Sequence, residues 1–386
     1  MIIPLYATST AQVATKLVEL REDGGVAALG RVLTLIIQCE AADIETSIQA
    51  ANLASMEHPC RVIVLTAEDL EGPASMDAQI RVGSDAGASE VIVLRLRGAP
   101  GGHLDAVSTP LLLPDAPVVV WWPGERPAVP ARDRLGRLAS RRITDAITAG
   151  RDSFAGSPRA ALKLLTSGYS PGDSDLTWTR LTPWRAQLAA ALEIPPVEAV
   201  TSATVTGPDL AASYLMGAWL ADRLGVPVRR QPTDSPFLTA VEFHLSGGRR
   251  ILLDKELEEA QAVLRITGQV DRVVSLSRRS RAESLAEELR RLEPDEAYGH
   301  LVLDALPAYL AAGAGAEAGT AGGTGTRGGP GTGTADGTGT RGGIGTGTAD
   351  GTGTRSGIGT GTAGGAETGT GADLAAGPAP KPGGSP

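Results

Sequence analysis

The chain has 386 residues, a formal net charge of −9, and a hydrophobic content of 42%. This length is sufficient for two domains with sizeable cores, and the acidic balance is unsuited to nonspecific binding of nucleic acid. The two cysteines are too few for a disulfide framework and suit a reducing compartment.

The amino terminus and the apolar segments point to a cytoplasmic protein. The first residues, MIIPLYATST, lack a basic stretch followed by an apolar core, so they do not predict a signal peptide. No apolar run approaches the roughly 18–20 residues that cross a membrane. We therefore expect a soluble, cytoplasmic protein with neither a membrane nor a nucleic acid as its partner.

The first 167 residues alternate between strand and helix patterns, which predicts an α/β domain with a mostly parallel sheet and helices on both faces. The predicted strands are 31–38, 61–66, 77–82, 90–96 and 118–122, with a short segment at 142–145. The predicted helices are 10–23, 41–56, 131–138 and 157–166. A cluster of turn residues at 168–175 marks the predicted domain boundary.

Residues 168–310 are predicted to form an α+β domain with a partly antiparallel sheet. Residues 176–180 are expected to be extended, and helices are expected at 182–193, 207–224, 282–292 and 297–309. The predicted strands are 198–204, 226–230, 238–245, 249–253, 262–267 and 272–277. From residue 311 a unit close to TGTRGG-GTGTADG recurs. It has too few apolar side chains to offset the entropy of ordering, so we predict a disordered low-complexity tail at 311–386.

The stretch LLLPDAPVVVWWPG at 111–124 contains the most informative strand. Alternate residues of 118–122 point to opposite faces, and all five are apolar, which is typical of a central strand covered on both sides by helices. Ligands of open α/β sheets usually bind beyond the carboxyl ends of the strands. Trp121 and Trp122 are therefore candidates for a functional site at this end, and the alternative is that they fill a core.

The catalytic motifs in the sequence lack the context that their chemistry needs. GTGTRG at 323–328 and 337–342 matches a dinucleotide pattern but follows no strand and opens no helix. GYSPG at 168–172 matches a hydrolase nucleophile motif, but a predicted helix precedes it, and Pro171 has no N–H for an oxyanion hole. We predict a turn there. No lysine follows a glycine, which argues against a P-loop.

Metal and phosphate sites have little support in the sequence. The four histidines lie far apart, and neither H-E-x-x-H nor C-x-x-C occurs. The loop RGAPGGH at 97–103 could bind a phosphate or be a plain loop, and scattered arginine pairs at 141–142, 229–230, 249–250 and 278–279 more often lie on solvated faces. Cys39 and Cys60 could lie near each other in neighbouring strands or be buried, inert thiols. We predict no catalytic residue, cofactor or metal.

The segment DLTWTRLTPWR at 175–185 combines two tryptophans with two arginines. Trp178 and Arg180 are expected on one face of an extended segment, and Trp184 and Arg185 on the first turn of the helix that follows. This composition is typical of an interface hot spot. The alternative is packing, because Trp184 belongs to an apolar stripe of that helix.

With these residues in view, the chain resembles the OpcA family, the assembly proteins of glucose-6-phosphate dehydrogenase found in actinobacteria and cyanobacteria. The segments that carry the resemblance are GRVLTL at 30–35, AANLASMEHPCRVIVL at 50–65, LPDAPVVVWWPG at 113–124 and DLTWTRLTPWR at 175–185. They occur in the family's order across most of residues 10–310. The resemblance implies a protein that binds glucose-6-phosphate dehydrogenase and promotes its active oligomer at the start of the oxidative pentose phosphate pathway.

We therefore predict a non-enzymatic assembly or activator protein whose partner is glucose-6-phosphate dehydrogenase. The candidate partner interface consists of Trp121, Trp122, Trp178, Arg180, Trp184 and Arg185. The alternative function is that of an enzyme or metabolite sensor that binds a sugar phosphate in the crevice after strand 118–122. Stoichiometry, self-association, a redox role of the cysteines, and action on assembly or on substrate affinity are left open.

Overall fold

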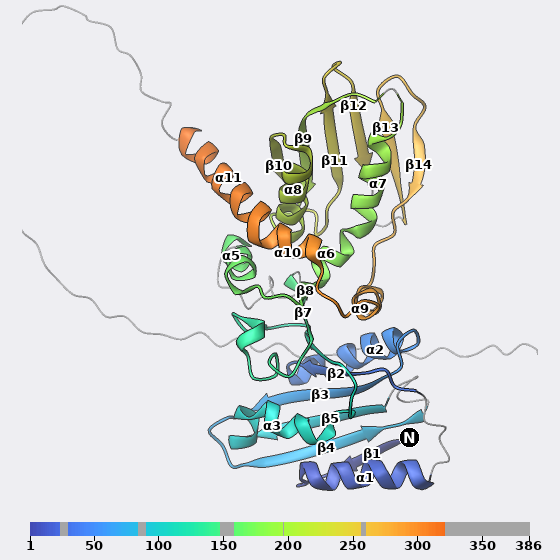
Figure 1. The fold of residues 1–386 in the computed structure, drawn as a ribbon, viewed down its shortest axis with the longest axis vertical. Helices are drawn as coiled ribbons and strands as arrows, with labels where there is room; N and C mark the ends of the chain where they lie inside the picture. Colours follow the sequence, from blue (N-terminus) through green and yellow to red (C-terminus); the bar gives the residue numbers. More distant parts are fainter. Residues whose placement is uncertain (24–29, 84–89, 147–157, 196, 256–259, 321–386) are drawn as a thin grey trace, which may run out of the picture. The chain divides into compact units, whose positions relative to one another are not determined.

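The computed structural model describes residues 1–23, 30–83, 90–146, 158–195, 197–255 and 260–320. Two β-sheets organise this part of the chain, each packed against its own helices (Figure 1). The repeat-containing segment 321–386, including both GTGTRG motifs, lies outside the described residues. Within the described residues, no helix is long and apolar enough to cross a membrane.

The N-terminal sheet has eight strands in the order β1-β4-β5-β3-β2-β6-β7-β8. Its strands are β1 Ile2–Leu5, β2 Leu33–Gln38, β3 Cys60–Glu68, β4 Ser75–Arg81, β5 Glu90–Arg97, β6 Val118–Trp122, β7 Arg141–Thr144 and β8 Asp173–Asp175. Strand β4 is antiparallel to β1 and β5, and the other neighbours are parallel. The predicted mostly parallel sheet is confirmed.

Strand β6 lies between β2 and β7, inside the sheet, as its apolar sequence predicts. Val119 and Trp121 join the hydrophobic cluster that contains helices α2 (Ile44–Ser55) and α9 (Arg281–Leu289). Val120 and Trp122 join the cluster on the opposite face, which helices α1 (Thr10–Asp23) and α3 (Leu104–Ser108) cover. Figure 1 shows these helices on the two faces of the sheet. Alternation along one strand thus builds two separate cores.

The C-terminal sheet has six strands in the order β10-β9-β11-β12-β13-β14. They are β9 Val200–Gly207, β10 Val228–Pro232, β11 Ala240–Leu245, β12 Arg250–Asp254, β13 Gln261–Ile266 and β14 Arg272–Ser275. Only the β9–β10 pair is parallel. Along β9, β11, β12 and β13, buried residues alternate with half-buried or exposed ones, so one face of the sheet packs into a core. The predicted α+β character is confirmed.

The core against the C-terminal sheet is built mainly from helices. The remaining helices are α5 Pro158–Gly168, α6 Leu176–Arg180, α7 Thr182–Leu192, α8 Ala211–Leu224, α10 Glu296–His300 and α11 Leu306–Thr320, with a π-helical segment at Leu301–Ala305 between the last two. Short 3₁₀ helices lie at Ala41–Asp43, Ala99–Gly102, Thr109–Leu111 and Pro130–Arg132. Buried residues from α5 to α8, α10 and α11 join β9 and β11–β13 in this cluster.

Two local expectations are wrong, and one strand lies where none was predicted. Residues 176–180 form helix α6 and are not extended, because the Asp175 side chain caps the backbone N–H of Thr177. The helix expected at 131–138 is a 3₁₀ turn followed by further turns. A Cβ on Gly136 would lie 1.8 Å from the Pro130 carbonyl oxygen, so the chain doubles back closely there. Strand β1 was not predicted at all.

The chain from Met1 to Gly325 groups into one compact unit. Helix α9, from the C-terminal half of the sequence, packs against α2 of the N-terminal half. Helix α11 continues to Thr320, beyond the predicted start of the tail. The domain boundary at residue 168 and the disorder of the tail stay predictions.

Candidate functional site

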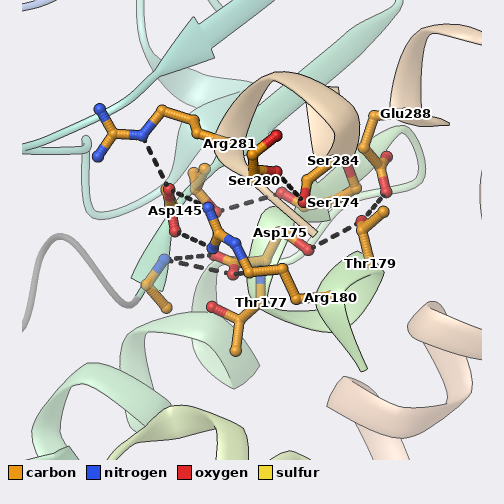
Figure 2. A network of polar contacts seen from close by, with 12 residues as sticks. Asp145, Ser174, Asp175, Thr177, Thr179, Arg180, Ser280, Arg281, Ser284 and Glu288 are labelled. Carbon is orange, nitrogen blue, oxygen red and sulfur yellow. Dashed lines mark hydrogen bonds and ion pairs between the residues drawn. The ribbon is translucent and has the colours of Figure 1, made fainter. Parts of the chain in front are cut away.

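A network of buried charged side chains lies at the carboxyl ends of β7 and β8 (Figure 2). Asp145 directly follows β7, and Asp175 ends β8. Because these neighbouring strands are parallel, their ends meet at the same edge of the sheet. The two residues are 1% and 0% exposed, so each carboxylate needs partners within the protein.

Asp175 satisfies its carboxylate with local donors. It accepts hydrogen bonds from the Thr177 backbone N–H at 2.8 Å, from the Ala146 backbone N–H at 3.0 Å and from the Thr144 hydroxyl at 2.6 Å. An aspartate that accepts from the first backbone N–H groups of a helix is a favourable N-cap. Asp175 therefore begins α6 and holds it against the end of β7.

Asp145 is paired with two arginines. The Arg180 guanidinium donates to both carboxylate oxygens, at 2.7 and 2.9 Å, and the Arg281 guanidinium lies 3.6 Å from one of them. Burial lowers the pKa of Arg180, but the hydrogen bonds and charge of Asp145 outweigh this effect and raise it above its ordinary value. A bidentate pair of this kind fixes orientation as well as charge.

Glu288 of helix α9 connects the same region to α6 and β7. Its carboxylate accepts from the Arg141 guanidinium at 2.5 Å and from the Thr179 hydroxyl. Arg141 also donates to the Glu293 carbonyl at 2.6 Å. Each charged group in this part of the network thus has a partner far away in the sequence, which makes the network a cross-link between distant elements.

Trp178 lies next to this network and is 1% exposed. Its indole N–H donates to the Asp295 carboxylate at 3.0 Å, and the Arg185 guanidinium carbon lies 3.3 Å from the centre of the ring. This is a cation–π contact within the chain. Burial lowers the pKa of Arg185 to about 10. Trp184 is 7% exposed and packs in the C-terminal core.

Trp121 and Trp122 are completely buried, on opposite faces of the N-terminal sheet. The Trp122 indole N–H donates to the Gln38 side chain at 2.9 Å. The six candidate interface residues therefore do not form one cluster. The structure brings Trp178 and Arg185 into contact, whereas Arg180 pairs with Asp145, and contact of the six with a partner stays a prediction.

A small cavity lies beside strands β7 and β8. Arg126, Thr144, Ser174 and Tyr298 are among the residues that line it, and its volume is about 10 Å³. That is room for about one water molecule, whereas small-molecule sites usually measure about 300–1,000 Å³. This cavity is therefore too small for a sugar phosphate.

The GYSPG segment lies between helix α5 and strand β8 and forms the predicted turn. The Pro171 carbonyl accepts from the Arg142 guanidinium at 2.6 Å, and Arg142 also pairs with Asp173. Arg141 and Arg142 are 3% and 7% exposed. The expectation that arginine pairs lie on solvated faces is wrong for this pair, because both guanidinium groups have buried carboxylate partners.

The loop at 97–103 packs closely against a neighbouring turn. Gly98 has a φ of 62°, and a Cβ there would lie 2.4 Å from the Gly72 carbonyl oxygen. The Arg97 guanidinium lies 3.5 Å from the Glu68 carboxylate. Glycine is thus required at position 98 by backbone conformation and close packing, whether or not the loop binds a phosphate.

The two cysteines occupy opposite ends of neighbouring strands. Cys39 follows the end of β2, whereas Cys60 begins β3 and lies opposite Leu33 in the parallel register. Of the two alternatives left open by the sequence, the one in which the cysteines lie near each other is wrong, because parallel strands bring like ends together. Neither cysteine forms a disulfide bond within the described residues, and burial raises the pKa of Cys39 to about 11. In the described part of the chain, no group of three or more histidine, cysteine or acidic residues could hold a metal ion.

Sequence reasoning missed Asp145 and Glu288. The position of Asp145 was a usable signal, because it directly follows a strand, β7, that ends beside Asp175. No sequence signal marked Glu288, whose partner Arg141 is 147 residues away. The sequence also did not reveal a groove of about 900 Å³ beside strand β10, to which Tyr214 and Tyr309 contribute.

Both halves of the chain match known protein families. Residues 51–165 match the family described as the N-terminal domain of the glucose-6-phosphate dehydrogenase subunit. Residues 171–302 match the family described as the C-terminal domain of that same subunit. Together the two matches cover well over half of the 386 residues. No curated protein sequence matches the chain.

Two solved structures are similar to the chain at a low level. One is a crystal structure of glucose-6-phosphate 1-dehydrogenase from Mycobacterium avium, with 13% identity and a TM-score of 0.41, covering 73% of this chain and 92% of that chain. The other is an E. coli structure described as trehalose-6-phosphate bound with UDP-2-fluoro glucose. It has 10% identity and a TM-score of 0.22, covering 52% of this chain and 65% of that chain.

Proposed function

Since the chain belongs to the OpcA family of glucose-6-phosphate dehydrogenase assembly proteins, we propose that it binds a glucose-6-phosphate dehydrogenase and promotes the active oligomer of that enzyme. The observation that carries the proposal is the pair of family matches, which extend over β3 to β8 of the N-terminal sheet and over the C-terminal sheet. We place this activity in the cytoplasm, at the start of the oxidative pentose phosphate pathway. Neither cysteine forms a disulfide bond within the described residues, and the two lie at opposite ends of neighbouring strands, which is compatible with that reducing compartment.

The geometry of the buried network supports a binding role for the protein. The carboxylates of Asp145, Asp175 and Glu288 are all engaged by arginines, hydroxyls or backbone N–H groups. A general base must reach a proton on its substrate, and these carboxylates are instead occupied in holding α6 and α9 to the N-terminal sheet. We infer that the network keeps a partner-binding surface rigid and takes no part in a reaction.

The proposal is tested by titrating the full chain into its cognate dehydrogenase. NADPH formation and the molar mass from light scattering are measured on the same mixtures, with each protein alone as the control. We expect the protein alone to turn over neither glucose 6-phosphate nor NADP, and the mixture to show higher activity together with a larger oligomer. Unchanged activity and mass at saturating protein would contradict the proposal. NADP reduction by the isolated protein would make it an enzyme.

A further inference from the structure

A groove of about 900 Å³ lies beside strand β10, at the edge of the C-terminal sheet. The residues Pro227–Arg230 line one side, and Ala308, Tyr309 and Ala312 of helix α11 line the other. Tyr214 and Ala221 of helix α8 also contribute to the lining. Figure 1 shows α11 and β10 beside α8. Strands β9 and β11 contribute further lining residues, so the groove is bounded by the sheet at its β10 edge and by a helix.

The hydrogen-bond pattern of β10 determines which backbone groups face this groove. Ala203 N–H donates to the Pro227 carbonyl at 3.0 Å, and Thr233 N–H donates to the Gly207 carbonyl at 2.8 Å. In a parallel ladder the N–H and C=O of alternate residues point to the same neighbour. Residues 227, 229, 231 and 233 therefore bond to β9, and Val228 and Arg230 direct their N–H and C=O groups away from β9.

These outward backbone groups are only partly satisfied by described residues. The Val228 carbonyl accepts from the Tyr309 hydroxyl at 3.2 Å, and no hydrogen bond within the described chain engages the backbone N–H or C=O of Arg230. A strand edge with free donors and acceptors pairs with another extended chain. An added strand supplies such groups at the spacing of the ladder, which a helix or a small molecule does not.

The helix wall of the groove is formed largely by small side chains. Ala305, Ala308 and Ala312 recur at helical spacing, followed by Gly313, and residues 308, 312 and 313 are exposed. Such a wall leaves space for bulky apolar side chains of an occupant. The Arg230 side chain is held by Asp209 at 2.7 Å and over the Tyr214 ring at 3.5 Å. The exposed Arg229 adds a cation to the rim of the groove, and the two acidic residues that also line it, Asp222 and Asp304, are hydrogen-bonded to His300.

We propose that an extended segment of the partner dehydrogenase binds in this groove and adds a strand to β10. The inference rests on the proposed function and names the contact through which it operates. The segment places apolar side chains against the alanines of α11 and an acidic side chain near Arg229. Strand β10 has five residues, of which the last, Pro232, has no backbone N–H. The added strand therefore pairs along residues 228–231, which correspond to about 13 Å of extended chain at roughly 3.3 Å per residue.

Two other occupants fit the groove less well. The chain's own segment 321–386 consists mainly of glycine, threonine and alanine, with Ile344, Ile358 and Leu374 as its large apolar residues. It therefore supplies few side chains that fill space against an alanine wall. A second copy of the chain would have to place its own β10 in the groove. Helix α11 flanks that strand in each copy and would have to enter with it. A segment from the dehydrogenase meets neither restriction.

Groove-filling substitutions in the full chain test the proposal. Ala308→Trp and Ala312→Trp place a large ring in the groove, whereas Ala311→Trp adds the same ring at an exposed position of α11 that does not line it. We expect the first two to weaken binding to the dehydrogenase at least tenfold and the third to change it less than twofold, all three with an unchanged melting temperature. Hydrogen exchange at the Arg230 amide should slow when the dehydrogenase is added.

Each contrary outcome identifies a different error. If all three variants bind like the wild type, the groove is not the contact, and the proposed function stands. If the wild type does not bind the dehydrogenase, both proposals fail. Slow hydrogen exchange at the Arg230 amide in the protein alone would indicate that the chain's own segment 321–386 occupies the groove. A self-association of the wild type that Ala308→Trp abolishes would assign it to a second copy. Either of the last two results overturns the inference.

Discussion

Replacement of Arg180 by alanine should destabilise the protein, because it leaves the buried Asp145 carboxylate without its main partner. The Asp145 side chain is 0% exposed and receives two hydrogen bonds from Arg180, at 2.7 and 2.9 Å. Removal of one member of a buried ion pair costs about 3–5 kcal/mol. Arg281 remains 3.6 Å from the carboxylate, and the Arg180 side chain is 16% exposed. We therefore expect the lower end of the range, about 3 kcal/mol.

This loss is measurable by thermal unfolding. For a chain of this size, a change of one kcal/mol shifts the melting temperature by about 2 °C, so Arg180→Ala should lower it by about 6 °C. Arg265→Ala is the matched control, because Arg265 forms a 2.6 Å pair with Asp254 in which both side chains are 42% exposed. An exposed pair contributes at most about 1 kcal/mol, so this variant should lose no more than about 2 °C.

The double variant separates a lost ion pair from a general packing defect. Asp145→Asn in the Arg180→Ala chain removes the unpaired charge, so it should recover part of the lost stability. Equal melting temperatures for Arg180→Ala and Arg265→Ala would refute the reasoning. A second decrease of similar size in the melting temperature when Asp145→Asn is added to Arg180→Ala would also refute it. An intact melting temperature with a tenfold weaker affinity for the dehydrogenase would instead assign Arg180 to the interface.

Three further predictions concern pH, thiol chemistry and the repeat segment. Hydrogen bonds to Asp222 raise the pKa of His300 above its ordinary value, so its stabilising charge is fully present below that value and is lost as the pH rises through the raised pKa. His300→Gln should therefore lower the melting temperature more at pH 6 than at pH 8.5, and an equal or reversed difference would contradict this sign. Burial raises the pKa of Cys39 from 9.0 to about 11, so its thiol should react with iodoacetamide at pH 8 about a hundredfold more slowly in the folded protein than in the unfolded chain. Mass spectrometry of the modified protein measures both rates. Equal rates would show that the Cys39 thiol is exposed. Termination of the chain after Thr320 should change neither the melting temperature nor the effect on the dehydrogenase, because 321–386 has few apolar side chains to bury; a drop of several degrees would show that this segment docks.

The arrangement of the N-terminal sheet was predictable because the composition of its strands reflects whether one or both faces of each strand are buried. The five apolar residues of 118–122 predict a strand buried on both faces, and β6 occupies those residues between β2 and β7. Alternation of helices and strands predicts parallel neighbours. Strand β1 was missed because Pro4 and the short, half-exposed segment Ile2–Leu5 give no periodic signal.

The candidate site was only partly predictable because its partners are far apart in the sequence. The sequence singled out the tryptophans and arginines of 175–185, but it grouped Trp178 with Arg180. The contact between Trp178 and Arg185 depends on a helical turn capped by Asp175, which the β-prone residues around Trp178 obscured. The pair between Arg141 and Glu288 joins elements 147 residues apart. Local patterns cannot specify such a contact, because it is determined by the packing of α9 on α2.

Mass photometry of the dehydrogenase at nanomolar dilution tests the central claim most directly. The dehydrogenase is diluted until its oligomer dissociates, and the full chain is then added at increasing concentration. The account predicts that the population of dissociated dehydrogenase falls and that a species containing both proteins replaces it, in parallel with the rise in activity. An unchanged mass distribution at saturating concentrations of the full chain would contradict the claim that this protein assembles the dehydrogenase.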